Sequence, residues 1–399
     1  MRAYERFMNY INFDTFSNEE SPTCPSTPGQ KVLGAYIVDE MKALGIADAR
    51  MDDNGYVYGT IEANVEGQPA IGLIAHMDTV GPAMPMNARI VENYDGGKIV
   101  LENGSVMDPD TYPGLKECAG KDMIVTNGRT VLGADDKAGI AEIMALAEKL
   151  INDPSVKHGK VCIGFTPDEE IGRGADLFDV KGFGAEFAYT VDGGAVGGID
   201  YETFNAASAS LKVNGVNIHP GSAKNRMKHA SLIAMEFNSM LPPHEIPAHT
   251  EGYEGFYHLT SMSGDESEAK LSYIIRDHSM QKFNERKEFF LKVADFINAK
   301  YGEGTVEAKV TDSYYNMREV IEQHMEIVER AENAYRACGI NPYTVPVRGG
   351  TDGCRLSFMG LPCPNLSTGG MGGHGLMECV AVQDMDTMVD VLQKIIEVC

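Results

Sequence analysis

Apolar runs and amphipathic segments alternate along the first half of the chain. Three mostly apolar runs, residues 70–75, 161–166 and 187–191, have the length and composition of buried strands. Segments 30–44 and 137–151 repeat their apolar positions every three or four residues, which predicts helices. Strands that alternate with helices predict an α/β fold, with a central sheet flanked by helices.

The pattern changes at residue 208 and returns after residue 314. Ala209, Leu211 and Val213 alternate with polar residues as in a half-buried strand. The segments that follow predict a helix at 227–241, strands at 256–261 and 270–276, a helix at 281–299, a strand at 306–310, and then helices at 321–338 and 385–398. We therefore predict a discontinuous first domain, residues 1–207 and 313–399, and an inserted α+β (ferredoxin-like) domain, residues 208–312.

Composition narrows the possible partners and the compartment. The 399 residues carry a formal net charge of −24, which argues against nucleic acid or an anionic membrane as a partner. The eight cysteines form no Cys-x-x-Cys pair, so we expect reduced thiols in a cytoplasmic protein. No apolar run is long enough to span a bilayer, and no apolar signal segment follows the charged start of the chain.

Residues that bind metals well follow the predicted strands. His76 and Asp78 come after the first apolar run, Glu169 and Glu170 after the second, and Asp192 after the third. Because ligands in open α/β sheets bind beyond the carboxyl ends of the strands, these side chains are expected at one edge of the sheet. The sequence therefore predicts a metal site there.

Two further residues complete a ligand set for two metal ions. Two ions about 3.5–4 Å apart need a bridging carboxylate, and Asp135, just before a predicted helix, is suited to that role. His76 and Asp192 can complete one ion, and Glu170 and His374, in a glycine-rich stretch, the other. Zinc accepts such a mixture of imidazole and carboxylate, and cobalt or manganese also fits it.

Asp78 and Glu169 have separate predicted roles. In an extended segment Asp78 faces the same side as His76, so its carboxylate can accept the second ring N–H of that histidine. Neighbouring side chains diverge, so we assign Glu170 to metal and Glu169 to the general base. Taken alone, His-x-Asp is more typical of a surface turn and Glu-Glu of a solvated helix start.

Three residues outside this set are candidates for contact with a substrate. His219 lies on a tight Ile218–Ser222 turn from which it could reach across a cleft, although an exposed turn histidine fits the spacing equally well. Arg276 and Arg348 could each bind a substrate carboxylate bidentately, although ordinary salt bridges are the commoner role of such arginines.

Seven short strings give the chain a resemblance to a known family. They are Ala75–Thr79, Gly133–Gly139, Thr166–Glu170, Val191–Gly194, Ile218–Gly221, Thr250–Tyr257 and Ser313–Arg318. With these strings the chain resembles the peptidase T family, bacterial tripeptide aminopeptidases within a larger group of co-catalytic zinc peptidases and deacylases. The resemblance runs from near the N-terminus to the terminal helix, and the last two strings point to peptidase T in particular.

The resemblance implies a zinc-binding α/β catalytic domain, with a mixed central sheet flanked by helices, and an inserted lid domain. It also implies roles for the candidate residues. It implies two zinc ions per chain, with Asp135 bridging and the other four ligands as assigned above. It also implies that Asp78 orients the ligand histidine, that Glu169 is the base and that His219 helps to stabilise the oxyanion. Arg276 and Arg348 fall in segments that line the family's substrate cleft.

One position departs from the family. Its members usually read His-Gly-Lys-His-Glu where this chain reads His374-Gly375-Leu376-Met377-Glu378. The ligand position is kept, and Met377 replaces the second histidine, which bears on local tuning of the site or on substrate preference.

The expected activity is removal of the N-terminal residue from short peptides, most of all tripeptides, by attack of a metal-activated water. The alternatives are a dipeptidase or N-acyl amino acid deacylase of the same group, or a catalytically silent peptide-binding protein. A short peptide is the expected partner, and both a monomer and a homodimer are compatible with the sequence.

Overall fold

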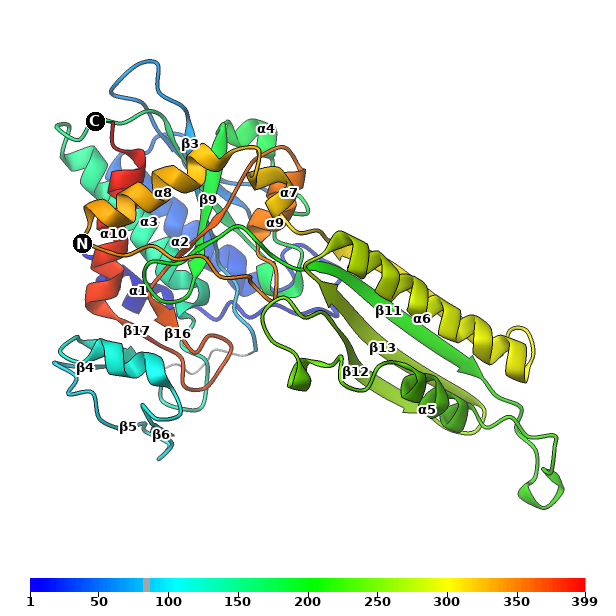
Figure 1. The fold of residues 1–399 in the computed structure, drawn as a ribbon. Helices are drawn as coiled ribbons and strands as arrows, with labels where there is room; N and C mark the ends of the chain where they lie inside the picture. Colours follow the sequence, from blue (N-terminus) through cyan, green and yellow to red (C-terminus); the bar gives the residue numbers. More distant parts are fainter. Residues whose placement is uncertain (82–86, 399) are drawn as a thin grey trace. The chain divides into compact units, whose positions relative to one another are not determined.

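The computed structural model describes residues 1–81 and 87–398, which divide into two compact units (Figure 1). Unit 1 comprises Met1–Tyr201, Met317–Val345 and Thr351–Cys399. Unit 2 comprises Glu202–Asn316 and Pro346–Gly350. Each unit has its own sheet and its own hydrophobic core, as separate domains do.

A mixed sheet of seven strands forms the centre of unit 1. Strands β8, β3, β9 and β15 run parallel in its middle, and antiparallel strands lie at both edges. Every residue of β3 and β8 is buried, which explains why these strands read as continuous apolar runs in the sequence. In sheet order the strands are β1 (Arg50–Met51), β2 (Val57–Ile61), β8 (Val161–Thr166), β3 (Ile71–His76), β9 (Phe187–Gly193), β15 (Asn365–Ser367) and β10 (Ile199–Asp200).

Helices flank this sheet, so the predicted fold class is confirmed. Helix α3 packs against β3 and β9, and α10 packs against α3 and α8. Helix α2 ends where the sequence predicts, because Gly45 adopts a left-handed φ of 104°. The helices of unit 1 are α1 (Ala3–Tyr10), α2 (Pro28–Leu44), α3 (Ala134–Asn152), α4 (Val180–Phe183), α7 (Arg318–Ile321), α8 (Met325–Ala337), α9 (Asp352–Phe358) and α10 (Val382–Ile396).

Two predicted helices are interrupted by local backbone geometry, and the other helices differ from their predicted bounds by at most three residues at either end. The predicted helix 321–338 is divided into α7 and α8, because His324 has non-helical backbone angles (φ −137°, ψ 39°). Helix α3 starts before residue 137, but Asp135 and Asp136 within it have non-helical angles, so regular helix begins at Lys137 as predicted.

A smaller antiparallel sheet in unit 1 borders the candidate site. It covers an apolar cluster that includes Met107, Leu115 and Met123. A short hairpin, β5 (Ile99–Val100) and β6 (Val106–Met107), and the 3₁₀ helix Pro113–Cys118 pack on the same cluster. In sheet order the strands of this smaller sheet are β16 (Gly370–Met371), β17 (Cys379–Ala381), β7 (Met123–Val125) and β4 (Arg89–Val91).

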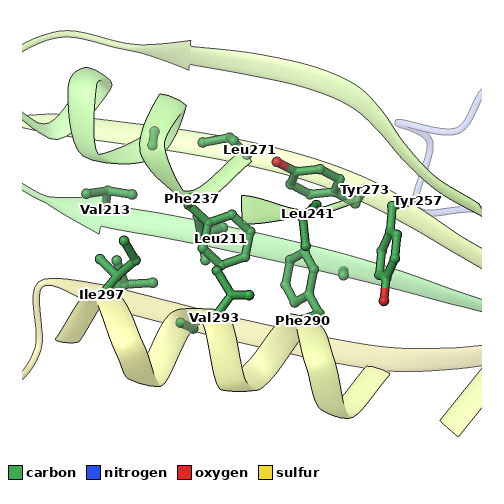
Figure 2. Packing of buried hydrophobic residues seen from close by; sticks show 14 of the residues in the cluster. Leu211, Val213, Phe237, Leu241, Tyr257, Leu271, Tyr273, Phe290, Val293 and Ile297 are labelled. Carbon is green, nitrogen blue, oxygen red and sulfur yellow. The ribbon is translucent and has the colours of Figure 1, made fainter. Parts of the chain in front are cut away.

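Unit 2 has the predicted order strand, helix, strand, strand, helix, strand. Its two helices pack on one antiparallel sheet, and Figure 2 shows Phe237 of one helix and Phe290 of the other in the core, with ring centroids 5.0 Å apart. In sheet order the strands are β12 (Phe256–Gly264), β13 (Glu268–Asp277), β11 (Asn205–Asn214) and β14 (Val306–Tyr314), and the helices are α5 (Ala230–Met240) and α6 (Met280–Tyr301).

The unit boundaries differ from the predicted domain boundaries. Unit 2 starts at Glu202, six residues before the predicted boundary at residue 208. The reason is that β11 starts at Asn205, and Asn205-Ala206-Ala207-Ser208 shows no alternation that would mark a strand. Pro346–Gly350 also joins unit 2, where Val347 N–H donates to the Glu202 carbonyl.

The structure contains no helix, within the residues it describes, that is both long and apolar enough to cross a membrane. The seven described cysteines are free thiols, and Cys399 lies outside the described residues.

Glu142 is a buried carboxyl group in α3, seven residues after Asp135 in the sequence. It is fully buried, and neither oxygen hydrogen-bonds to any residue that the structure describes. Burial raises the pKa of Glu142 well above its ordinary value, and the charges of Asp384 and Asp386 raise it further. The folded protein therefore holds this carboxyl neutral at a pH where the unfolded chain ionises it.

Glu142→Gln is therefore expected to raise the melting temperature, and to raise it more at pH 8 than at pH 5. In the unchanged protein, stability falls as pH rises above the unfolded pKa, because folding must return a proton to Glu142. Glutamine removes this term, and a gain of each kcal/mol corresponds to roughly 2–4 °C in a domain of this size. Thermal melts of both proteins across this pH range measure the effect, and an equal change at both pH values would contradict it.

Candidate metal centre

Three adjacent parallel strands deliver the predicted residues to one edge of the large sheet. His76 is the last residue of β3, Glu169 and Glu170 lie just beyond β8, and Asp192 lies at the end of β9. Strand β3 lies between β8 and β9, so their carboxyl ends are neighbours. The predicted convergence of these residues is what the structure shows.

Asp135 lies between the two predicted ligand histidines. Its Oδ1 is 2.9 Å from Nε2 of His76, and its Oδ2 is 3.2 Å from Nε2 of His374. One carboxylate thus offers one oxygen to each side, as a ligand that bridges two ions must.

Each histidine has a second acid beside it. Nε2 of His76 is 3.4 Å from Oδ1 of Asp192, and Nε2 of His374 is 2.9 Å from Oε2 of Glu170. His76, Asp135 and Glu170 also have ligand atoms that all lie within 4.8 Å of one another. All five predicted ligands therefore meet in unit 1, with Asp135 at the centre.

The charges of these groups match a site for cations. Burial raises the pKa of Asp192 to about 7, and hydrogen bonding to Asp135 and Glu170 raises the pKa of His374 to about 10. Oε1 of Glu170 is buried and has no hydrogen-bond partner among the described residues. Carboxylates so close together resist ionisation, and bound cations would remove that cost and satisfy the unpaired oxygen. The donor set of imidazole nitrogens and carboxylate oxygens thus fits divalent metal ions.

The Asp78 carboxylate lies beside the ring nitrogen of His76 that it is predicted to orient, and it has further partners. Nδ1 of His76 lies 3.4 Å from Oδ1 of Asp78 and 3.1 Å from the Asp78 backbone carbonyl. The carboxylate also accepts the backbone N–H groups of Glu169 (2.9 Å) and Glu170 (3.2 Å). Asp78 thus contacts the histidine and also fixes the backbone that carries both glutamates.

Glu169 is half-buried beside the ligand cluster. Burial raises the pKa of Glu169 well above its ordinary value, and the charge of Asp192 raises it further. A carboxyl group with a raised pKa at the edge of a metal site is suited to accept and release a proton.

The comparison with known proteins decides the family. A model of peptidase family M20/M25/M40 matches residues 126–398. The chain belongs to this family. It is therefore a peptidase. A relative confirms the predicted resemblance: peptidase T of Caldanaerobacter subterraneus subsp. tengcongensis is 52% identical over 402 residues, covering 99% of this chain and 98% of that protein.

Solved structures share the fold. Aminopeptidase PepT from Bacillus cereus aligns with a TM-score of 0.78 at 22% identity, covering 99% of this chain and 97% of that chain. A tripeptidase from Staphylococcus aureus aligns with the same TM-score, identity and coverage.

Sequence reasoning did not assign three buried acids that border the metal centre of this M20/M25/M40 chain. Asp136 is fully buried, and its Oδ2 accepts the backbone N–H of His76 at 3.1 Å. Asp352, at the start of α9, interacts electrostatically with His76, and burial raises the pKa of Asp352 to about 6. Burial raises the pKa of the third acid, Glu378, to about 7. Only their positions in the sequence could have indicated two of these acids. Asp136 directly follows the predicted ligand Asp135, and Glu378 lies four residues after the predicted ligand His374.

Asp168 holds the segment that carries the two glutamates. It adopts a left-handed conformation (φ 59°), and its carboxylate accepts the backbone N–H and the hydroxyl of Ser26 and the side-chain amide of Gln30. The Gln30 amide oxygen in turn accepts the Asp168 N–H at 3.0 Å. A buried network thus determines where the chain turns after β8.

His219, Arg276 and Arg348 all belong to unit 2. His219 is exposed, and its Nδ1 accepts the Gly221 N–H at 3.2 Å. The Arg276 guanidinium lies over the Tyr314 ring, 5.3 Å from its centroid. Their predicted substrate contacts stay predictions.

Arg348 is held within unit 2 by its own side-chain contacts. Its guanidinium donates to the carbonyls of Gly252 (2.9 Å) and Glu254 (2.7 Å) and to the Thr250 hydroxyl (2.7 Å). It also lies over the ring of Phe204, 5.1 Å from the centroid. These contacts support a structural role for Arg348, and its predicted binding of a substrate carboxylate stays a prediction.

Proposed function

We propose that this protein is an aminopeptidase that uses two zinc ions to release the N-terminal residue of short peptides, above all tripeptides. The observation that carries the proposal is the position of Asp135 between His76 and His374, with Glu169 at the edge of the same cluster. The names of the relatives support it, since they are peptidase T, an aminopeptidase and a tripeptidase. Cobalt or manganese would also suit these ligands.

The five ligands would hold the metals in two groups that share Asp135. His76 and Asp192 lie on one side of it, and Glu170 and His374 on the other. When bound, two divalent cations supply Lewis acidity that lowers the pKa of water and polarises a peptide carbonyl.

Glu169 transfers the proton between the attacking water and the leaving amine. Its raised pKa allows the carboxylate to take a proton from the attacking water and then to give it to the leaving amine. The Asp78 carboxylate orients this step, because it holds the backbone N–H of Glu169 at 2.9 Å. The predicted role of His219 at the oxyanion is part of the same proposal.

An apolar pocket beside the ligands would receive the side chain of the first residue. A cavity of about 230 Å³ is lined by Asp135 and Asp192, and it shares Gly370–Gly372 with a neighbouring pocket of about 350 Å³. The side chains that line the second pocket are mostly apolar, and they include Met107, Leu115, Met371 and Met377. Met377, the residue that departs from the family pattern, thus makes this wall apolar.

A panel of tripeptides tests this function. Leu-Gly-Gly is expected to lose its first residue, whereas its N-acetylated form and the dipeptide Leu-Gly are expected to be poor substrates. Asn-Gly-Gly, of similar shape, should have a kcat/KM at least about tenfold lower, since about 1.4 kcal/mol of uncompensated desolvation corresponds to that factor. Chromatography of the products measures all four reactions.

The other outcomes of the panel contradict the proposal in different ways. Cleavage of the acetylated peptide alone would indicate a deacylase, and cleavage of the dipeptide alone a dipeptidase. No cleavage by protein that has bound its metal would indicate a silent binder.

The cysteines support a cytoplasmic location. All seven that the structure describes are free thiols, which is typical of proteins in a reducing compartment.

A further inference from the structure

Glu378 makes an unusual set of contacts with the segment that leads to Asp135. Its side chain is buried, with a residue exposure of 1%. Oε2 accepts the backbone N–H groups of Leu132 (2.6 Å) and Gly133 (2.8 Å), and Oε1 accepts that of Asp135 (2.9 Å). One carboxylate thus binds three donors within four consecutive residues.

The Leu132–Asp135 segment needs an external partner to hold its shape. It lies at the N-terminal end of α3, and the first backbone N–H groups of a helix have no partner within the helix. The residue at the N-cap position is Gly133, in a left-handed conformation (φ 75°), and it has no side chain that could accept them. Glu378, 243 residues further along the chain than Asp135, accepts these N–H groups instead.

Glu378 is also tied to the segment that carries His374. It lies four residues after that histidine, directly before β17, which pairs with β7 and β16. The same segment approaches Asp135 closely, because a Cβ added at Gly373 would lie 3.2 Å from Oδ2 of Asp135. The backbones of two predicted ligands are therefore fixed relative to each other through one side chain.

We propose that Glu378 is a positioning residue that holds the Asp135 carboxylate between the two metal ions and thereby increases metal affinity. The inference rests on the proposed metal centre. Outer partners that orient a metal ligand typically change metal affinity by about 10–100-fold when removed. Glu378 acts on the ligand through its backbone, so its loss frees the carboxylate to rotate away from the bridging position.

Glu378→Gln tests the proposal with little change in shape. If the amide oxygen accepts from Leu132 and Gly133, the amide NH₂ faces the Asp135 N–H, and two donors then oppose each other. The variant is expected to bind zinc about 10–100-fold more weakly in a competition with a chromophoric chelator. In the cobalt-substituted variant, the visible absorption bands should shift, because the geometry around the ion has changed.

Glu142→Gln is the matched control, because Glu142 is also a buried carboxyl of unit 1 but hydrogen-bonds to no residue that the structure describes. It should bind zinc and cobalt as the unchanged protein does. If Glu378→Gln does not fold, as judged by circular dichroism of the metal-free protein, then Glu378→Asp, whose carboxylate is one methylene shorter, should show the weaker binding.

The outcomes separate this inference from the proposed function. Unchanged protein that binds two zinc ions, together with folded Glu378 variants of equal affinity and equal cobalt spectrum, would overturn the positioning role alone. Unchanged protein that binds no zinc would overturn the metal centre and the positioning role with it.

Discussion

Replacing Glu169 with glutamine is expected to lower kcat by about 10³-fold and to leave metal binding intact. General acid–base catalysis by a positioned side chain contributes ~10²–10⁴-fold, and glutamine cannot take up or release a proton at neutral pH. The acids beside Nε2 of the two histidines are Asp135, Asp192 and Glu170. Replacing Glu169 therefore leaves all the predicted metal ligands in place. Steady-state kinetics on Leu-Gly-Gly and the zinc content of the same sample measure the two effects together.

Turnover and zinc content, measured together, identify the role of Glu169. Near-normal turnover by Glu169→Gln with two zinc ions bound would show that another group moves the proton. Loss of zinc from the variant would instead show that Glu169 is a ligand, and the assignments of Glu169 and Glu170 would then be reversed. Glu142→Gln, a substitution of the same kind elsewhere in unit 1, should keep both activity and zinc.

Replacing Asp135 with asparagine is expected to remove both zinc ions and nearly all activity. The two oxygens of Asp135 face two different histidines, and an amide offers one oxygen and one NH₂ group in their place. The loss in metal affinity should exceed the ~10–100-fold that removal of an outer partner costs, because a shared ligand is lost by both ions at once. Zinc content after gel filtration and turnover of a tripeptide provide the measurement.

Asp200→Asn is a suitable control for this substitution. Asp200 is a largely buried aspartate in β10, at the edge of the same sheet, and burial raises the pKa of Asp200 to about 6. It should retain both zinc and activity. If Asp135→Asn kept two zinc ions, the bridging role would be wrong, and Asp136, whose ligand atoms also lie near those of His76 and Asp192, would be the candidate to replace it.

Much of the fold could be predicted because the central strands are buried on both faces. Strand β8 matches its apolar run residue for residue, and β3 and β9 differ from theirs by one or two residues at the ends. Helix bounds followed the apolar periodicity where local geometry agreed with it. They differed at His324, whose backbone angles interrupt the helix, and no periodicity argument detects such a break.

The meeting of the predicted ligands could be anticipated because His76, Glu170 and Asp192 lie at the carboxyl ends of neighbouring strands, which the sheet brings together. The residues that hold the ligands could not. Glu378 acts on Asp135 from 243 residues away, and Asp168 acts through Ser26 and Gln30, so only the tertiary structure shows these contacts. The contacts of the Asp78 carboxylate with the backbone N–H groups of Glu169 and Glu170 could not be predicted for the same reason, since strand alternation shows which side Asp78 faces but not which N–H groups lie there.

Titration of metal-free protein with zinc is the most direct test of the proposed two-metal centre. Release of the first residue from Leu-Gly-Gly would be followed as zinc is added, alongside binding of the metal to the protein. We expect no turnover without metal and a plateau of activity when two zinc ions are bound per chain. Full turnover by the metal-free protein, or a plateau at one ion per chain, would contradict this expectation.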